Sequence, residues 1–367
     1  MFRESWARDS TFRHNNVMTS KRQVNIGNMA IGGGAPVSVQ SMTNTDTRDV
    51  EATLGQIRSL AAYGCEIIRV AVPDEAAALA LAGIAAESPL PVVADIHFKA
   101  KLAVDSIAAG AAGLRINPGN IGGREKVKSV VEAARAASVP IRIGVNAGSL
   151  PKDMLSMAEG EPVKALVETV LRYVNLFEDL GFEDFKISAK SSSVSETIDA
   201  NLEIAGRIDY PIHLGVTEAG TKWTGSIRSA VGIGALLAQG VGDTIRVSLT
   251  GDPVEEMRAC YEILRSLGLR EHGPGMISCP TCGRTEIDVE AIALEVERRL
   301  EDYDSSFEVA VMGCVVNGPG EARRADFGIA GGKGEGLIFA QGKALRKVAA
   351  DELVEALFAE IEKTRKK

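Results

Sequence analysis

Residues 67–96 read IIRVAVPDEAAALALAGIAAESPLPVVADI, and this stretch contains the repeating unit of the larger part of the chain. It begins with a β-branched run, Ile67–Val72, continues with an alanine-rich helical pattern, Glu75–Glu87, and ends with a second aliphatic run, Val92–Ile96. Both runs are apolar at nearly every position, which is typical of strands covered on both faces. Two such strands joined by a helix of about 10–15 residues predict a parallel β/α unit.

The same alternation recurs along most of the chain. The runs expected to be strands are Val37–Met42, Ile67–Val72, Val92–Ile96, Gly113–Asn117, Ile141–Val145, Phe185–Ser188, Ile212–Val216 and Thr244–Leu249. Helical patterns alternate with them at Val50–Tyr63, Glu75–Glu87, Lys99–Ala109, Arg124–Ser138, Pro162–Leu180, Val194–Ile208, Ile227–Gln239 and Val254–Leu267. Eight consecutive units predict a closed (β/α)8 TIM barrel, an α/β fold, over residues 23–268.

An open, doubly wound sheet is the alternative fold. Such sheets usually carry a phosphate-binding glycine turn directly after the first strand. Here Gly32-Gly33-Gly34 comes before the first run, so it is better interpreted as a simple turn than as a dinucleotide-binding motif. The barrel is therefore preferred.

Composition bounds the class of protein. The 367 residues carry a net charge of −8, with 45% hydrophobic and only 5% aromatic residues, which predicts a globular protein and argues against nucleic-acid binding as its main function. No apolar run approaches the ~18 residues of a membrane span, and the N-terminus has no apolar signal core. The five cysteines are odd in number and indicate a reducing, cytoplasmic location. Residues 1–22 mix charges without a period and are expected to be a loose arm.

Basic residues lie inside strands that should be entirely aliphatic. They occur towards the carboxyl ends of five of the runs, as Arg69, Arg115, Arg142, Lys186 and Arg246. An unpaired buried charge is strongly unfavourable, and any one of these residues alone could equally form a structural ion pair. Five of them converging on one rim of the barrel are better explained by a polyanionic ligand such as a diphosphate. Active sites of such barrels lie at this carboxyl face.

Uncharged and acidic side chains accompany the basic ones at the strand ends. Candidate ligand-binding residues are Asn117, Asn146, Ser188 and Ser248, with Lys190 close by. His97 and Glu218 are the candidates for proton transfer, and Asp95 could orient a neighbour. Capping of the following helix is the competing explanation for the asparagines. The remaining thiols, Cys65 and Cys260, have apolar neighbours and are expected in the core.

The alternation stops after Leu267, and residues 269–367 predict a small α+β domain. Gly268–Met276 has the composition of a linker, and Gly331–Gly336 is expected to be a hairpin turn. The expected elements are a helix at Val289–Glu301, strands at Phe307–Met312, Asp326–Ala330 and Gly336–Ala340, and a closing helix at Ala349–Lys366.

This second domain contains two cysteine motifs, Ile277-Ser-Cys-Pro-Thr-Cys-Gly-Arg284 and Val311-Met-Gly-Cys-Val-Val-Asn-Gly-Pro-Gly-Glu321. They supply the thiols of Cys279, Cys282 and Cys314, and the carboxylate of Glu321. Iron–sulfur clusters are usually held by four thiolates, so three nearby cysteines predict a cluster with a non-cysteine fourth ligand or an open position. A structural zinc site is the alternative; it would have to close with His272 or a carboxylate.

Taken together, the motifs resemble the 4-hydroxy-3-methylbut-2-enyl diphosphate synthase family, in its bacterial two-domain form. The resemblance spans nearly the whole chain and includes both cysteine motifs. It rests also on Val39-Gln-Ser-Met-Thr-Asn-Thr-Asp46, Ile68-Arg-Val70, Asp95-Ile-His-Phe98, Leu114-Arg-Ile-Asn-Pro-Gly-Asn120, Arg142-Ile-Gly-Val-Asn146 and Leu214-Gly-Val-Thr-Glu-Ala-Gly220.

The resemblance implies a 4Fe–4S cluster held by Cys279, Cys282, Cys314 and Glu321, with Glu321 also acting in catalysis. It implies an oxidoreductase of the non-mevalonate isoprenoid pathway, which opens the ring of 2-C-methyl-D-erythritol 2,4-cyclodiphosphate with loss of water. Two electrons would come singly from reduced flavodoxin or ferredoxin, and Glu218 would donate the proton to the leaving hydroxyl. It also implies a homodimer in which one subunit's cluster covers the other's barrel.

Two other functions are compatible with the residues alone. A phosphate-binding barrel could be a non-redox transferase, with the small domain as a zinc-closed structural cap. An iron–sulfur carrier is a further possibility, although a carrier would not need a basic barrel. Metal identity separates the two enzymes, and ligand binding that depends on Arg115 and Arg142 separates an enzyme from a carrier.

Overall fold

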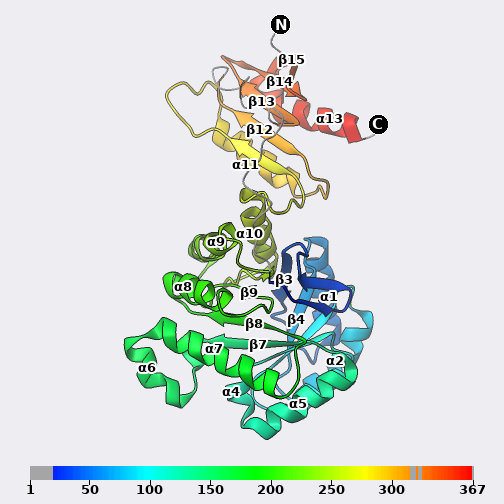
Figure 1. Cartoon of the computed structure of the whole chain (residues 1–367). Helices are drawn as coiled ribbons and strands as arrows, with labels where there is room; N and C mark the ends of the chain where they lie inside the picture. The colour runs from blue at the N-terminus through cyan, green and yellow to red at the C-terminus, as the bar shows by residue number, and fades with distance from the viewer. Residues whose placement is uncertain (1–19, 315–319, 321–324, 366–367) are drawn as a thin grey trace. The chain divides into compact units, whose positions relative to one another are not determined.

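The computed structural model describes residues 20–314, 320 and 325–365. The chain forms two compact units, one up to Arg270 and the other from Glu271 onward. Each unit has its own sheet, and the strands of the first are surrounded by helices (Figure 1).

The first unit is the predicted (β/α)8 barrel. Its parallel strands follow the order β8-β7-β6-β5-β4-β3-β10-β9, and a parallel bridge between Ile187 and Ile212 joins β8 to β9. The open-sheet alternative is thereby excluded. The strands are β3 (Ser38–Met42), β4 (Ile67–Ala71), β5 (Val92–Ile96), β6 (Gly113–Ile116), β7 (Ile141–Asn146), β8 (Phe185–Lys190), β9 (His213–Leu214) and β10 (Thr244–Ile245).

Helices cover the outside of the barrel. They are α1 (Val50–Ala62), α2 (Glu75–Glu87), α3 (Ala100–Ala108), α4 (Pro118–Ile121), α5 (Arg124–Ala137), α6 (Leu155–Gly160), α7 (Pro162–Asp179), α8 (Val194–Ala205), α9 (Lys222–Ala238) and α10 (Pro253–Ser266). The predicted start of α9, Ile227, is wrong, because the helix begins five residues earlier, at Lys222. Its first turns bury Gly225 and Ser229, which carry no apolar signal, and a Cβ on Gly225 would lie 2.6 Å from Leu249 Cδ2.

A hairpin packs against the amino-terminal ends of the barrel strands. It consists of β1 (Gln23–Ile26) and β2 (Met29–Gly32), which pair antiparallel. Its buried side chains cluster with Ile67 and Val93, residues at or near the start of β4 and β5. Ser20, within the segment expected to be a loose arm, donates hydrogen bonds to Asp243 through its backbone N–H and its hydroxyl. Residues 1–19 of that arm lie outside the described residues.

The second unit is a five-stranded sheet with helices, as the predicted α+β domain requires. β11 (Gly275–Ser278), β12 (Glu308–Met312) and β13 (Phe327–Gly331) run parallel, whereas β14 (Glu335–Ala340) and β15 (Lys343–Ala349) pair antiparallel. The helices α11 (Val289–Leu300) and α13 (Leu353–Arg365) complete it. The hairpin turn predicted after β13 is confirmed. The prediction of a linker at Gly268–Met276 was wrong at its end, because β11 begins at Gly275. Strand β15 was not predicted, because most of its side chains are exposed and leave no apolar pattern.

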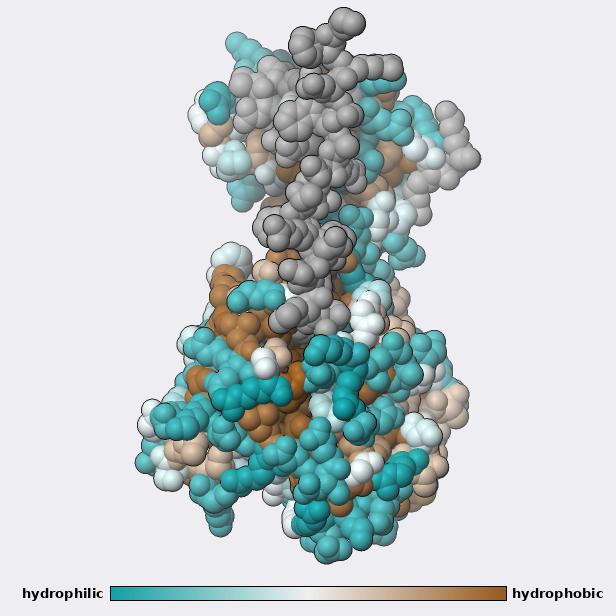
Figure 2. Space-filling view, in the orientation of Figure 1, coloured by the Kyte–Doolittle hydropathy of each residue, from teal (hydrophilic) through white to brown (hydrophobic). Residues whose placement is uncertain are grey.

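The surface of the barrel unit is mainly hydrophilic in the face shown, with brown apolar areas between polar ones (Figure 2). On α9 the exposed apolar side chains Trp223, Ile227 and Val231 recur every fourth residue and therefore lie on one side of the helix. Among the helices that the structure describes, none is long and apolar enough to cross a membrane.

Candidate functional site

The interior of the barrel is lined by polar side chains. Registered partners in a sheet point to the same face, and Arg115 on β6 is registered with Arg142 on β7, which is registered with Lys186 on β8. The alternate residues of these strands, such as Ile116, Ile143 and Ile187, belong to the hydrophobic core. The basic residues therefore point into the barrel, where such folds normally pack Val, Ile and Leu.

Six basic side chains line this interior, and we call them the basic interior: Arg69, Arg115, Arg142, Lys186, Lys190 and Arg246. Five of them were predicted to converge on the barrel. Lys190 was noted beside Ser188 but not chosen as a ligand-binding residue. Its place two residues after Ser188, with the same strand parity, is the signal that could have identified it.

Two carboxylates lie among the residues of the basic interior, and the first is Asp95 on β5. Its Oδ1 accepts a hydrogen bond of 3.0 Å from Arg115 Nη1, and its Oδ2 lies 3.5 Å from Arg69 Nε and 3.6 Å from His97 Nε2. Burial alone would raise the pKa of Asp95, but the charge of Arg69, the hydrogen bond with His97 and the charges of Arg115 and Arg142 hold it well below its ordinary value. Asp95 thus stays ionised and orients its neighbours.

Glu256 is the second carboxylate, and it reaches the interior from helix α10. It lies 3.4 Å from Arg246 Nη2, and it accepts hydrogen bonds from the Ser41 hydroxyl at 3.1 Å and the Leu249 backbone N–H at 3.0 Å. Glu256 was not among the residues predicted from the sequence. A carboxylate four residues before Cys260, on the apolar face of the predicted helix, could have indicated it.

Several side chains of the barrel interior have buried polar atoms for which the described part of the chain provides no hydrogen-bond partner. Arg142 Nε and Nη1, Lys186 Nζ and both ring nitrogens of His213 are buried with no hydrogen bond among the described residues. Burial lowers the pKa of Lys186 and of Lys190 well below their ordinary values, and the charge of Arg142 lowers both further. Burial, followed by the charges of Arg142 and Lys190, also lowers the pKa of His213. Native proteins rarely leave such donors unsatisfied, so the chemistry of this part of the barrel suits anionic or polar ligand atoms.

Burial and neighbouring cations also lower the pKa values of Arg69 and Arg142. Burial lowers the pKa of Arg69 to about 10, an effect that Asp95 opposes and that Arg246 and Arg115 add to. Burial lowers the pKa of Arg142 well below its ordinary value, and Arg69 and Arg115 lower it further. A bound anion would relieve this repulsion directly.

The uncharged candidates lie around the same strand ends. Ser188 is buried on β8. Asn146, the last residue of β7, and Ser248 are each half-buried. Asn117 is buried and caps α4, with its Oδ1 accepting from the Gly119 N–H at 3.1 Å, as the capping explanation expected. Its amide nitrogen also donates to Ser149, which positions the loop after β7.

Glu218 and His97 are exposed in the loops that follow β9 and β5. Glu218 has a φ of 54°, a left-handed conformation that a residue with a side chain adopts at a cost of about 1–2 kcal/mol. Strain of this kind is often retained at functional sites. The exposed carboxylate is therefore available to a ligand entering the barrel.

Cys279 and Cys314, one from each cysteine motif, lie at one edge of the second sheet. Cys279 follows β11 directly, and Cys314 lies two residues after β12, the parallel neighbour of β11. Parallel strands end at the same edge, and the backbone N–H of Cys279 bonds to the Val311 carbonyl at 3.1 Å. Two thiols from segments far apart in sequence thus come to neighbouring strand ends.

The donors at this edge fit a thiolate-bound cluster in their chemistry. The Gly313 N–H donates to Cys279 Sγ at 3.0 Å, the kind of hydrogen bond that tunes cluster thiolates. Cys282 is exposed in the loop, and a hydrogen bond from the Arg284 backbone lowers the pKa of its thiol. Among the described residues no three His, Cys, Asp or Glu side chains converge on a point that could hold a metal ion. The predicted fourth ligand, Glu321, lies outside those residues.

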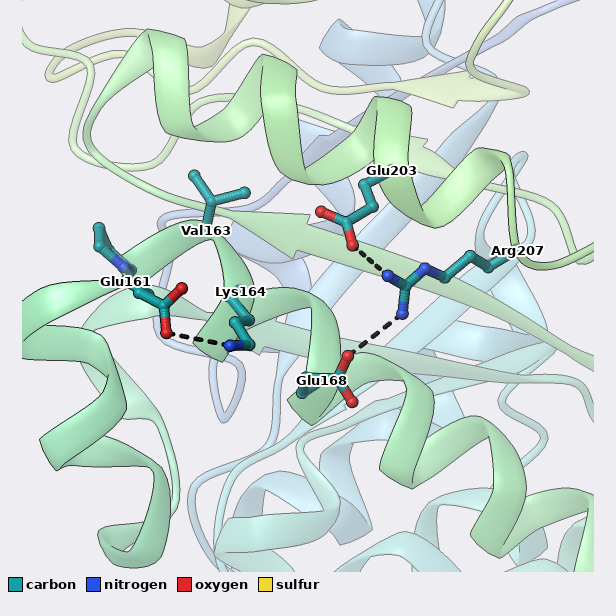
Figure 3. Close-up of a pocket in the computed structure, with 7 residues that line it drawn as sticks. Glu161, Val163, Lys164, Glu168, Glu203 and Arg207 are labelled. Carbon is teal, nitrogen blue, oxygen red and sulfur yellow. Dashed lines mark hydrogen bonds and ion pairs between the residues drawn. The ribbon is translucent and has the colours of Figure 1, made fainter.

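A hollow on the outside of the barrel does not have the character of a site (Figure 3). It lies between α7 and α8, and its charged side chains pair with each other: Lys164 with Glu161, and Arg207 with Glu168 and Glu203. Ion pairs exposed in this way contribute little, and both cations of the hollow are already paired with carboxylates.

Two family models match the chain. One, described as the GcpE TIM-barrel domain, matches residues 21–261, and the other, described as the GcpE protein C-terminal domain, matches residues 275–363. The two matched segments correspond to the two compact units.

Close relatives carry one name. A protein of Geobacter sulfurreducens named 4-hydroxy-3-methylbut-2-en-1-yl diphosphate synthase (flavodoxin) is 58% identical over 93% of this chain and 97% of its own length. A protein of Clostridium tetani with the same name is 56% identical over 92% and 97%. Among solved structures, the dihydropteroate synthase of Yersinia pestis aligns with 68% of this chain and 100% of its own, with a TM-score of 0.50 and 12% identity, which shows similarity of fold alone.

Proposed function

Because the chain belongs to the 4-hydroxy-3-methylbut-2-en-1-yl diphosphate synthase family, we propose that it converts 2-C-methyl-D-erythritol 2,4-cyclodiphosphate to (E)-4-hydroxy-3-methylbut-2-enyl diphosphate. The reaction opens the cyclic diphosphate, takes up two electrons and releases water. It belongs to the non-mevalonate route to isoprenoids.

The basic interior is the observation that carries this proposal. Five buried basic side chains and the half-buried Arg246 face two carboxylates, Asp95 and Glu256, in a chain whose net charge is −8. Guanidinium groups bind phosphate oxygens in pairs of parallel hydrogen bonds. The diphosphate of the substrate would bind among Arg69, Arg115, Arg142, Lys186, Lys190 and Arg246, and these residues would stabilise the charge that appears when the ring opens.

The side chains at the mouth would orient the sugar carbons and move protons. Asn117, Asn146, Ser188 and Ser248 provide uncharged hydrogen-bonding groups on four different strands or strand ends. Glu218 would protonate the leaving hydroxyl, from a loop that is exposed in the free protein. His97, whose ring is held beside Asp95, would hold a second hydrogen bond to substrate.

The second unit would hold a 4Fe–4S cluster through Cys279, Cys282, Cys314 and Glu321. The cluster, when bound, supplies electrons one at a time. Reduced flavodoxin or ferredoxin would be the donor, in line with the word flavodoxin in the relatives' names. Gly313 would hold Cys279 in place through its N–H.

We further propose a cytoplasmic homodimer. The barrel and the cysteine motifs belong to different units, so a complete site requires that a barrel and a cluster be brought together. A second copy would provide this arrangement, with one subunit's cluster over the other's barrel.

The decisive measurement is the iron, sulfide and zinc content of anaerobically prepared protein, followed by turnover of the cyclodiphosphate with a chemical reductant. About four irons and four sulfides per chain, with product formed, are expected. One zinc without sulfide would overturn the proposal and favour a non-redox transferase with a zinc-closed cap. Full cluster content without turnover would point instead to an iron–sulfur carrier.

A further inference from the structure

Gly144 lies in the middle of strand β7 and points into the barrel. It is two residues after Arg142, so it shares the inward parity of the basic interior. Its backbone does not have the positive φ that would call for glycine. Glycine inside a strand weakens the strand by about 0.5–1 kcal/mol relative to alanine. Since the backbone conformation does not require glycine here, the neighbouring atoms must explain it.

The space that a side chain would fill at this position is occupied by Arg115. A Cβ on Gly144 would lie 2.5 Å from Arg115 Nε, 3.1 Å from its Nη2 and 3.2 Å from its Cζ. The guanidinium of Arg115 therefore lies directly across the backbone of the neighbouring strand. In this position its Nη1 reaches Asp95 at 3.0 Å, while its Nε is buried and has no hydrogen-bond partner within the described ranges of the chain.

A second inward glycine has the same relation to a second cation. A Cβ on Gly215, in the segment after β9, would lie 2.5 Å from Lys190 Nζ. It would also lie 2.6 Å from the backbone oxygen of Arg246, so substitution there would disturb the chain itself. At Gly144 all three nearest atoms belong to the end of one flexible side chain. A substitution at Gly144 should therefore displace Arg115 without disturbing the backbone.

We propose that Gly144 is a positioning residue for ligand binding: by lacking a side chain it leaves room for the Arg115 guanidinium to lie against Asp95, the orientation in which Arg115 would bind the ligand. Gly215 has the same role for Lys190. The inference rests on the proposed function, because it assumes that the basic interior binds the diphosphate. It accounts for glycines at two interior positions where TIM barrels usually place branched aliphatic residues.

The test is Gly144→Ala in the full-length, cluster-loaded protein, with Gly113→Ala as a matched control. Gly113 is also an inward glycine of ordinary φ, on β6, but its Cβ would approach Val93, Ile26 and a backbone oxygen at 3.3–3.6 Å and no cation. We expect Gly144→Ala to keep the unfolding midpoint and to raise the Kd of the cyclodiphosphate, measured by calorimetry, roughly tenfold or more. Gly113→Ala should leave this Kd within about twofold, since it removes no contact to a cation.

A double-mutant cycle separates positioning from a general packing effect. In an Arg115→Gln background, Gly144→Ala should change Kd no further, because the side chain that it displaces is already gone. Additive effects, or equal effects of Gly144→Ala and Gly113→Ala, would overturn the inference. If the wild-type protein binds the cyclodiphosphate and Gly144→Ala binds it equally well, the inference fails alone. If the wild-type protein binds none, the proposed function fails as well.

Discussion

Single residues of the barrel interior carry buried polar groups that lower the stability of the fold. Lys186 is almost completely buried, and its Nζ has no hydrogen-bond partner in the described part of the chain. Its neighbour across the ladder is another cation, Arg142. A buried charge without a partner lowers the free energy of unfolding, and such residues persist where function needs them.

Replacing Lys186 with Met, an apolar side chain of similar length, should therefore stabilise the protein. We expect Lys186→Met to raise the free energy of unfolding by about 1–3 kcal/mol at pH 7, measured by urea denaturation. The same variant should bind inorganic pyrophosphate more weakly. A stability equal to or below that of the wild type would mean that Nζ already has a partner in solution.

The pH dependence of stability follows from the same lysine. Its pKa is lowered by folding from an ordinary value of 10.5, so above the lowered pKa the unfolded chain binds more protons than the folded one. Stability then rises with pH from the lowered pKa towards 10.5. Urea denaturation at pH 7 and pH 9 should show a gain for the wild type and a smaller one for Lys186→Met. An equal gain in both proteins would assign the effect to other groups, such as Lys190.

At the scale of elements, the adjacent parallel strands β11 and β12 bring Cys279 and Cys314 to one edge of a sheet. Changing Cys279, Cys282 or Cys314 to Ala should abolish retention of iron and sulfide, because thiolate ligands hold such clusters. Cys260→Ala is the matched control. Its thiol is fully buried in the barrel unit and burial raises its pKa to about 12, so iron content should not change.

The carboxylate proposed as the fourth ligand should behave differently from the thiols. Glu321→Ala should retain a damaged cluster and lose turnover. Iron and sulfide analysis together with the rate of product formation would test this. An unchanged rate would remove Glu321 from the proposed mechanism.

The β1–β2 hairpin is the element that closes the amino-terminal side of the barrel core. Ile31 on β2 is fully buried in a cluster with Ile67 and Val93. Ile31→Ala should lower the free energy of unfolding by about 2–5 kcal/mol, from lost burial and the cavity left behind. The Kd for pyrophosphate should stay the same, because the basic interior lies further towards the carboxyl ends. A loss below about 1 kcal/mol in urea denaturation would show that the hairpin is not part of the cooperative core.

At the scale of the whole molecule, the two units divide the proposed function between them. The barrel unit contains the basic interior, and the unit from Glu271 onward contains the cysteine motifs. A chain ending at Arg270 should therefore fold and bind pyrophosphate with an affinity within a few-fold of the full chain, yet contain no iron and form no product. Calorimetry and metal analysis would measure both. Failure of this fragment to fold would show that the units depend on each other for stability.

The fold was predictable from sequence because its signals are local and repeated. A strand covered on both faces and an amphipathic helix each leave their pattern within about 15 residues. Prediction failed where the pattern was weak, as in the first turns of α9, where Gly225 and Ser229 are buried, and in β15, where the side chains are mostly exposed.

For the candidate site, the sequence by itself determined which charges are anomalous: a basic residue in an aliphatic strand is visible without any structure. Tertiary structure decided how those charges are paired and what surrounds them. That Glu256 reaches Arg246 from a helix, that His213 shares the interior, and that Gly144 makes room for Arg115 depend on register between segments far apart in the chain. Such contacts leave no local pattern, because they arise when the barrel closes and brings separate strands together.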